Sequence, residues 1–477
     1  MRVILVMIPF PESFEWDFGI FGKNAKEFFT VGRPMGLTYI ASVLRNEGHH
    51  IEIIDCMAEN LNPATFEAKL KKKKFDVLGL SVVTPAFLDA IVGAKIAKRV
   101  NPKCKVVIGG AHVTVMERSG KSERLMETPE FDFAVVGEGE ITTQELMGAL
   151  SKKKKDFHGI DGLIWRENER VIINKPREPI SDLDTLPLPA VDLLKKEGYS
   201  RSPSSVKREP AFSVMTTRGC PYDCIFCNKV FGHKVRRRSI KNVMKEITYL
   251  KEKMGAREIR FWDETFTLDK KYTIDLCREM IRTKTGLLWS CNGHINTLDE
   301  EMLKWMKKAG CWEIDFGIES GNDRVLKEIQ KNITKDQVRR DIKMVKHAGI
   351  EPRTFFIFGF PGDTKKTVEE TIRFALEINP SYATFYLLQV YPGTKLFFQL
   401  VENFGEDPDN IIDIIMKERV YYFDNKKVSH EDLVNYVIIA HRKFYIRPLY
   451  IGKTLLKIRS PEDLYRHIKA GLTMLKI

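Results

Sequence analysis

The stretch Thr216–Lys229, TTRGCPYDCIFCNK, places three cysteines within eight residues: Cys220, Cys224 and Cys227. Three thiolates on one loop can bind one metal centre, because thiolate is a common protein ligand of zinc and of iron–sulfur clusters. A structural zinc site takes four ligands, and the next thirty residues offer only His233 as a fourth. The spacing favours a cubane iron–sulfur cluster with one iron free of protein ligands. A zinc site and a chance group of core cysteines are the weaker alternatives.

Strands and amphipathic helices alternate on the C-terminal side of the cysteines. The strands are expected at Phe212–Thr216, Glu258–Trp262, Leu288–Asn292, Trp312–Ile318, Arg353–Phe358 and Ala383–Gln389. The clearest helices between them are expected at Val243–Lys253, Tyr272–Thr283, Glu300–Lys308, Lys335–His347 and Lys366–Glu377. Six such units predict a partial barrel over residues 210–400, with functional residues at the C-terminal ends of the strands.

Residues 1–150 show the same alternation in a separate block. Its strands are expected at Arg2–Ile8, Ile51–Asp55, Val77–Val82, Lys105–Ile108 and Phe133–Val136. Apolar strands separated by helices predict a doubly wound α/β domain with a parallel sheet. Residues 151–209 contain a stretch rich in proline, serine and charge, so they are expected to be a connector. Residues 401–477 are expected to be helical, with Leu433–Ile446 and Pro461–Leu475 as the clearest helices.

Composition narrows the class of protein. The chain has 477 residues, of which 43% are hydrophobic, and this is enough for two or three domains. No window reaches the roughly 18 uninterrupted apolar residues of a membrane span, and no secretory signal opens the chain, so reduced thiols and a cytoplasmic location are expected. The net charge of +13 comes from scattered lysine runs, which are typical of solvated helix ends, so a nucleic-acid partner is disfavoured.

The cysteine spacing Cys-x3-Cys-x2-Cys, with Phe226 before the last cysteine and a six-unit barrel around it, resembles the radical S-adenosylmethionine superfamily. The resemblance implies that the cysteines hold a [4Fe-4S] cluster whose open iron binds S-adenosylmethionine. It also implies that the methionine amino group meets Asp263 and Glu264, although the glycines of the family's Gly-Gly-Glu motif are missing here. By the same resemblance Glu319 and Ser320 contact the ribose and carboxylate, and Gly359 lies near the adenine.

The loops of the N-terminal block resemble those of the cobalamin-binding domain. The matching residues are Ser81 and Thr84 in a hydroxyl-rich loop, the pair Gly109 and Gly110, and Gly137 and Glu138 in a Gly-Glu-Gly-Glu segment. Neither a dinucleotide-binding Gly-x-Gly-x-x-Gly nor a phosphate-binding Gly-x4-Gly-Lys is present in these loops.

Cobalamin domains with a histidine ligand carry Asp-x-His-x-x-Gly after the first strand, whereas this chain has Pro9-Phe10-Pro11. The resemblance therefore implies base-off cobalamin with no histidine below the cobalt. His112 is expected to cap a loop or touch the corrin rather than bind cobalt.

Both resemblances together indicate a cobalamin-dependent radical S-adenosylmethionine enzyme, of the anaerobic magnesium-protoporphyrin cyclase and lipid methylase-like group. Such an enzyme generates a 5′-deoxyadenosyl radical and modifies an unactivated carbon, most commonly by methyl transfer from methylcobalamin. The alternative is radical oxidation, cyclisation or carbon–carbon bond formation on a tetrapyrrole or lipid-like substrate. An RNA-modifying methylthiotransferase and a non-catalytic sensor are weaker alternatives.

The expected partners are a small-molecule or lipid-like substrate and an external one-electron donor of the flavodoxin or ferredoxin type. The C-terminal segment Phe444–Ile451 mixes aromatic, aliphatic and basic residues, with Lys453, Lys457 and Arg459 after it. This pattern allows peripheral contact with a membrane surface, and it equally fits a helix packed on the barrel.

Overall fold

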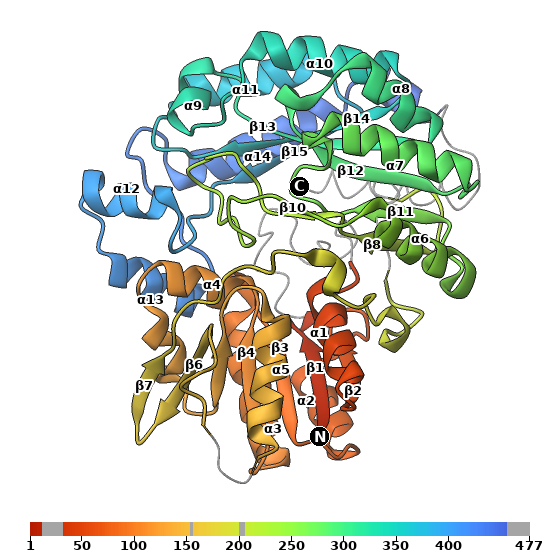
Figure 1. The fold of residues 1–477 in the computed structure, drawn as a ribbon. Helices are drawn as coiled ribbons and strands as arrows, with labels where there is room; N and C mark the ends of the chain where they lie inside the picture. The colour runs from red at the N-terminus through yellow and green to blue at the C-terminus, as the bar shows by residue number, and fades with distance from the viewer. Residues whose placement is uncertain (12–31, 153–155, 200–205, 456–477) are drawn as a thin grey trace.

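The computed structural model describes residues 1–477 except 12–31, 153–155, 200–205 and 456–477. The chain forms two α/β bodies, one above the other in Figure 1, with the N-terminal body in red to yellow and the barrel in green to blue. The α/β class and the order of the two bodies confirm the sequence-based prediction.

The N-terminal body is built on a seven-stranded sheet in the order β2-β1-β3-β4-β5-β6-β7. Its strands are β1 (Arg2–Met7), β2 (His50–Asp55), β3 (Val77–Ser81), β4 (Lys105–Gly109), β5 (Phe133–Val135), β6 (Leu163–Glu167) and β7 (Arg170–Ile173). The first five pair in parallel, as expected for strands joined by helices. Those helices are α1 (Met35–Asn46), α2 (Pro63–Lys71), α3 (Phe87–Val100), α4 (Ala111–Arg118) and α5 (Gly139–Leu150).

Strands β6 and β7 were not predicted from the sequence. They lie in the segment 151–209, which was expected to be a connector, and they extend the N-terminal sheet as antiparallel strands. Trp165 and Leu163 of β6 pack into the apolar core beside Phe133 of β5. The segment therefore contributes to the core before it crosses to the barrel.

The second body is an open half-barrel of six parallel strands in the order β15-β14-β13-β12-β11-β8. The strands are β8 (Ala211–Val214), β11 (Glu258–Phe261), β12 (Leu288–Gly293), β13 (Cys311–Glu319), β14 (Glu351–Phe358) and β15 (Tyr382–Leu387). The helices are α6 (Ile240–Met254), α7 (Lys270–Arg282), α8 (Glu300–Lys308), α9 (Asp323–Glu328), α10 (Lys335–His347) and α11 (Lys365–Ile378). The six predicted units are all present.

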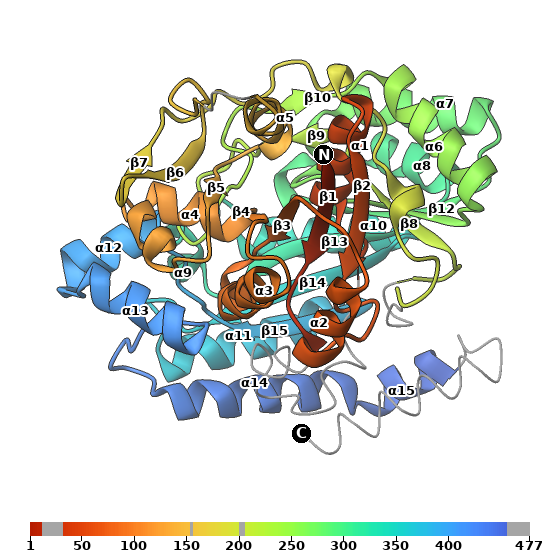
Figure 2. The same cartoon turned by 90° about the horizontal axis from the view of Figure 1, so that it is seen from below.

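The C-terminal residues form helices that touch both bodies. These are α12 (Lys395–Phe404), α13 (Pro408–Glu418), α14 (His430–Tyr445) and α15 (Pro448–Leu455). Figure 2 shows α13 beside the N-terminal body and α14 running along the barrel. The Tyr445 hydroxyl donates to the Ala383 carbonyl of β15 at 2.7 Å, and Tyr450 donates to Ser381 at 3.0 Å. The helix expected at Pro461–Leu475 lies outside the described residues.

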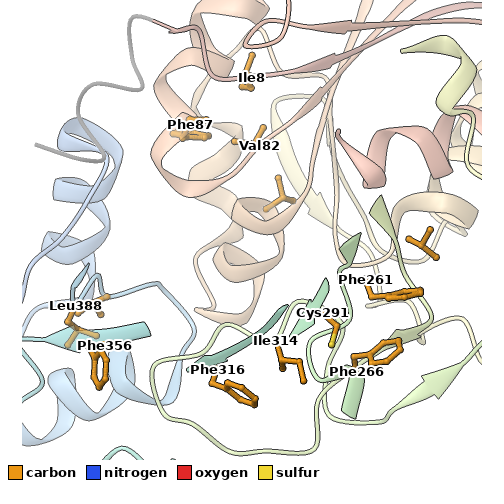
Figure 3. Packing of buried hydrophobic residues seen from close by; sticks show 14 of the residues in the cluster. Ile8, Val82, Phe87, Phe261, Phe266, Cys291, Ile314, Phe316, Phe356 and Leu388 are labelled. Atoms are coloured by element: carbon orange, nitrogen blue, oxygen red, sulfur yellow. The ribbon is translucent and has the colours of Figure 1, made fainter. Parts of the chain in front are cut away.

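The apolar core continues from one body into the other. Figure 3 shows Ile8, Val82 and Phe87 of the N-terminal body in the same cluster as Ile314 and Phe316 of β13. Cys277, Cys291 and Cys311 are buried in this core and unpaired, as expected from their apolar surroundings. Within the described ranges, no helix is both long and apolar enough to cross a membrane.

Candidate active site

The three cysteines lie on a loop enclosed by two short strands. Strands β9 (Thr217–Arg218) and β10 (Arg236–Arg237) pair antiparallel, so residues 219–235 form a closed loop, here called the cysteine loop. Cys224 is buried, Cys220 is half-buried and Cys227 is exposed, and all three thiols are free. The loop leaves the C-terminal end of the first barrel strand, which is where barrel active sites lie.

The three thiols do not form a site for a single ion. In the described part of the chain, no three His, Cys, Asp or Glu side chains converge on a point where one ion could bind. A cubane does not need such convergence, because its three cysteines bind three different irons. Burial raises the pKa of the Cys224 thiol, and the nearby Lys331 ammonium opposes that shift. Iron binding would deprotonate the thiols.

Asp263 and Glu264 follow β11 and have different surroundings. Asp263 is fully buried, and its Oδ1 accepts bonds from the Thr216 amide at 2.9 Å, the Thr216 hydroxyl at 2.8 Å and the Thr217 hydroxyl at 2.7 Å. This carboxylate therefore fastens the chain just before the cysteine loop to the end of β11. Its expected contact with the methionine amino group stays a prediction, for which only the unbonded Oδ2 is available.

Glu264 is the better placed of the two carboxylates for a cationic ligand. Its Oε2 is buried and has no hydrogen-bond partner. Burial raises the pKa of Glu264 to about 7, opposed by a hydrogen bond from the Gly219 backbone at the start of the cysteine loop. A buried, unpartnered carboxylate oxygen beside the cysteines fits an ammonium group such as that of a bound S-adenosylmethionine.

Glu319 ends β13 in a backbone conformation that is rare for a residue with a side chain, at φ 69° and next to a β-bulge. Its Oε1 accepts a bond from the buried Lys331 ammonium at 2.9 Å. Burial would lower the pKa of Lys331, but the charges of Glu319 and Cys224 outweigh it and raise the pKa. Lys331 thus carries a positive charge beside the cysteine loop.

Sequence reasoning missed Lys331. It lies in the turn after α9, twelve residues beyond Glu319, in a stretch without a recognisable pattern. The stacking of Tyr222 from the cysteine loop on His294, with ring centroids 3.8 Å apart, was missed for the same reason. Only the fold brings these residues to the same strand ends.

Ser320 and Gly359 lie at the ends of neighbouring strands, as expected. The Ser320 hydroxyl is buried, lies 3.3 Å from the Thr371 hydroxyl and accepts a bond from the Asn322 amide at 3.2 Å. The Gly359 amide donates to Asp363 Oδ2 at 3.0 Å. Both groups therefore shape the loop backbone, and their contacts with the ribose, carboxylate or adenine stay predictions.

The loops expected to bind cobalamin meet at the C-terminal edge of the N-terminal sheet. The Val82 amide donates to the Gly109 carbonyl at 2.8 Å, and the His112 amide donates to the Val82 carbonyl at 3.0 Å. At Gly110, φ is 102° and a Cβ atom would lie 2.9 Å from the Val82 oxygen, so only glycine fits. These contacts join the loops of Ser81 and Gly110 into one backbone cradle, which fits a ligand lying against it.

His112 and Thr84 are buried below this cradle. His112 Nδ1 lies 3.3 Å from the Thr84 hydroxyl, and the imidazole packs on Phe87 at 4.5 Å between ring centroids. Burial lowers the pKa of His112 to about 3, so the ring is neutral. His112 has no surface open to solvent, so its expected contact with the corrin stays a prediction.

Gly137 and Glu138 follow β5, and Glu138 faces the barrel. The Gly137 amide donates to the Thr114 hydroxyl at 3.0 Å, and the Glu138 carboxylate pairs with Arg218 and Arg236 on either side of the cysteine loop. The expected contact of Glu138 with cobalamin stays a prediction. These ion pairs join the N-terminal body to the barrel.

A three-cysteine loop at the mouth of a half-barrel, opposite a doubly wound domain with a glycine cradle, defines the class of radical enzyme that pairs an iron–sulfur cluster with a corrin domain. Two family models match this chain, one in each body. Residues 214–375 match the radical SAM superfamily, and residues 24–147 match the B12 binding domain.

The chain is 35% identical over 98% of its length to an uncharacterized methyltransferase of Pyrococcus horikoshii, of which it covers 95%. It is 29% identical over 88% of its length to the anaerobic magnesium-protoporphyrin IX monomethyl ester cyclase of Rubrivivax gelatinosus, of which it covers 74%. The chain belongs to the cobalamin-dependent radical S-adenosylmethionine enzymes.

Solved structures share this fold. The radical S-adenosylmethionine methyltransferase TsrM from Kitasatospora setae, with cobalamin and a [4Fe-4S] cluster, matches 84% of this chain and 78% of its own, with a TM-score of 0.65 and 20% identity. The cobalamin-dependent enzyme OxsB matches 99% of this chain and 72% of its own, with a TM-score of 0.70 and 17% identity. The two family models imply that this enzyme uses S-adenosylmethionine with an iron–sulfur cluster in the barrel and cobalamin in the N-terminal body.

Proposed function

We propose that this enzyme transfers a methyl group by way of cobalamin to an unactivated carbon of a small molecule. The observation that carries the proposal is the placement of the cysteine loop directly against the loops of the cobalamin domain, through Glu138, Arg218 and Arg236. A relative that shares nearly the full length of the chain is named a methyltransferase, which supports the same reading.

Different residues of this chain would hold the cluster, bind S-adenosylmethionine and position these groups. Cys220, Cys224 and Cys227 would hold the cluster, and Glu264 would receive the amino group of S-adenosylmethionine on its buried, unbonded Oε2. Lys331 holds Glu319 in place and adds a positive charge beside the loop. When bound, the cofactors supply a carbon-centred radical and a transferable methyl group, and the protein fixes their relative positions.

The loop after β1 supports base-off cobalamin. Pro9, Phe10 and Pro11 follow the strand where histidine-ligated domains carry their ligand, and Phe10 is buried in the core. The one histidine near the cradle, among the residues described, is His112, and it is buried and neutral. We infer that no histidine binds the lower face of the cobalt.

The test is anaerobic reconstitution with iron, sulfide and hydroxocobalamin, followed by S-adenosylmethionine carrying a labelled methyl group and a strong reductant. Transfer of label to the protein-bound cobalamin, with release of S-adenosylhomocysteine, is expected. A Cys224→Ala variant should lose formation of 5′-deoxyadenosine, because the radical step needs the cluster. Release of 5′-deoxyadenosine without any labelled cobalamin would contradict methyl transfer.

The second candidate is a non-methylating radical reaction of oxidation, cyclisation or carbon–carbon bond formation. It is favoured by the likeness to the magnesium-protoporphyrin IX monomethyl ester cyclase, which spans most of both chains. The same labelling experiment separates the two reactions, since this candidate predicts 5′-deoxyadenosine without S-adenosylhomocysteine.

The remaining expectations are part of this proposal. The proposed domains are residues 1–150, a connector at 151–209, the barrel at 210–400 and a C-terminal region at 401–477. The connector adds β6 and β7 to the first sheet, and the C-terminal region is helical as far as the structure describes it. An external flavodoxin or ferredoxin would supply the electron. The packing of Phe444, Tyr445 and Tyr450 on the barrel supports a structural role for that segment over contact with a membrane.

A further inference from the structure

A buried network of ion pairs joins both ends of the cysteine loop to the N-terminal body. Arg218 and Arg236 lie opposite each other in the β9–β10 pair. Arg218 donates to Glu138 at 3.1 Å and to Glu140 at 2.6 Å, and Arg236 pairs with Glu138 at 2.5 Å. All four side chains are at most 6% exposed. The network therefore contains two positive and two negative charges that water does not screen.

The burial of these charges makes their pairing specific. A charge taken out of water is costly unless it is paired and hydrogen-bonded, and removing one partner leaves the other uncompensated. Burial alone would lower the pKa of Arg218, but the charges of Glu140 and Glu138 outweigh it and raise the pKa. The loop base thus has one favoured position relative to Glu138 and Glu140, which belong to the start of α5.

A second contact holds the loop just beyond its last cysteine. Arg118, the final residue of α4, donates to the carbonyls of Asn228, Lys229 and Val230, the last two at 2.9 and 3.3 Å. From the other side, Gly393 packs so closely that a Cβ atom there would lie 2.7 Å from the Arg118 Cβ. Arg118 is therefore fixed between the loop and the segment that follows β15.

Helix α4, which ends at Arg118, and helix α5, which begins beside Glu138, both start at loops expected to bind cobalamin. Helix α4 starts at Ala111, directly after Gly110, and ends at Arg118, so its eight residues span roughly 12 Å between the cradle and the cysteine loop. Helix α5 starts at Gly139, next to Glu138. Both helices are short rigid spacers between one cofactor site and the other.

We infer that Arg118, Glu138 and Glu140 are positioning residues, which hold the cysteine loop and its cluster at a fixed place relative to the cobalamin cradle. We call these residues, with Arg218 and Arg236, the interdomain clamp. The inference rests on the cofactors of the proposed function, and it concerns their placement rather than the reaction. It differs from the expectation that Glu138 contacts cobalamin directly, because the clamp acts on the cluster.

The test compares Glu138→Gln with Glu145→Gln. Glu145 lies on the same helix and pairs with Arg177 near the surface, away from the cysteine loop, so it is a matched control. Each protein is reconstituted with iron, sulfide and hydroxocobalamin. Two quantities are measured: the rate at which a chelator removes iron, and the electron paramagnetic resonance spectrum of the reduced cluster with and without hydroxocobalamin.

The clamp predicts that Glu138→Gln binds hydroxocobalamin normally. It also predicts that iron is lost about tenfold faster, the effect of one missing charge-assisted hydrogen bond. The cluster spectrum should change and should respond less to hydroxocobalamin, whereas Glu145→Gln should match the unmodified enzyme.

Loss of hydroxocobalamin binding with an unchanged cluster would overturn the clamp and make Glu138 a cobalamin contact. Equal effects in both variants would overturn it as well. If Glu138→Gln does not fold, Arg118→Lys serves in its place, because it keeps the charge but loses the fork that spans three carbonyls. It should show the same faster iron loss, and an unchanged rate would contradict the clamp. None of these measurements depends on methyl transfer.

Discussion

At the scale of single residues, the burial of Glu264 raises the cost of its negative charge and so favours a cationic ligand. Its carboxylate is buried beside the cysteine loop with Oε2 unbonded, and burial raises its pKa to about 7. Because the pKa is raised, ionisation of Glu264 costs the unliganded protein folding free energy as the pH rises from the ordinary glutamate pKa towards this value. A bound ammonium group offsets that cost by pairing with the carboxylate.

We expect the affinity for S-adenosylmethionine to increase as the pH rises through about 7, because the carboxylate is ionised only above its pKa. In Glu264→Gln this pH dependence should disappear, and binding above pH 7 should weaken about tenfold through loss of one charged hydrogen bond. Equilibrium binding to the reconstituted enzyme on either side of pH 7 measures both effects. Glu279→Gln is the control, because this half-buried glutamate pairs with Arg282 on the same helix. An equal pH slope in Glu264→Gln would refute the assignment.

Gly110 shows how one missing side chain shapes the cobalamin cradle. Alanine there would adopt φ 102° and place its Cβ 2.9 Å from the Val82 oxygen, so the two loops would have to separate. We expect Gly110→Ala to lower both the thermal stability and the affinity for hydroxocobalamin.

Gly148→Ala is the comparison variant. It lies within α5, where a Cβ atom would meet nothing within 4 Å, and it should be neutral or stabilising by up to about 1 kcal/mol. Normal hydroxocobalamin binding by Gly110→Ala, measured by spectroscopic titration, would show that the cradle is not the binding surface.

At the scale of elements, α13 ties the C-terminal helices to the N-terminal body. Arg419 ends α13 in a left-handed conformation, at φ 73°, and its guanidinium donates to the Pro85 carbonyl at 2.7 Å and to Asp89 at 3.1 Å. Pro85 directly follows Thr84 of the hydroxyl-rich loop. The C-terminal region thus supports a loop that is expected to bind cobalamin.

We expect Arg419→Gly to lower the apparent Tm by several degrees and to weaken hydroxocobalamin binding. Glycine is favoured in a left-handed helix end, so the backbone is not strained and the loss reports the side-chain contacts alone. Differential scanning fluorimetry and spectroscopic titration measure the two effects. The exposed pair of Arg373 and Glu369 supplies the control Arg373→Ala, which should change neither quantity. An unaltered Tm in Arg419→Gly would contradict the role of α13.

At the scale of the whole molecule, the two bodies share a continuous apolar cluster and buried charges across their interface. Interfaces of that kind couple the folding of neighbouring domains. Neither body is therefore expected to unfold independently.

We expect calorimetry to show a single unfolding transition. Hydroxocobalamin at about one hundred times its Kd should move the entire transition upward, since binding then adds about 2.7 kcal/mol to the folded state. Two separate transitions, of which only the first shifts with hydroxocobalamin, would show that the bodies unfold independently.

Much of this molecule could be predicted because the deciding signals are local. The three cysteines lie within eight residues, and the periodicity of each strand or helix is contained in a short window. β6 and β7 could not be predicted in this way, because edge strands form by pairing with β5 rather than by a pattern of their own. Lys331 and Arg118 have no surrounding motif, so their approach to the cysteine loop follows only from the fold.

The sequence by itself determined the family and the two α/β bodies, and it predicts the cluster ligands, since ligand spacing along a loop needs no knowledge of distant contacts. Only the tertiary structure decided what the carboxylates do. In the fold, Asp263 binds Thr216 just before the cysteine loop, and Glu264 keeps one carboxylate oxygen without a hydrogen bond. Glu138 pairs with Arg218 and Arg236. Burial and partner choice fix the role of a charged group, and both depend on residues far apart in the chain.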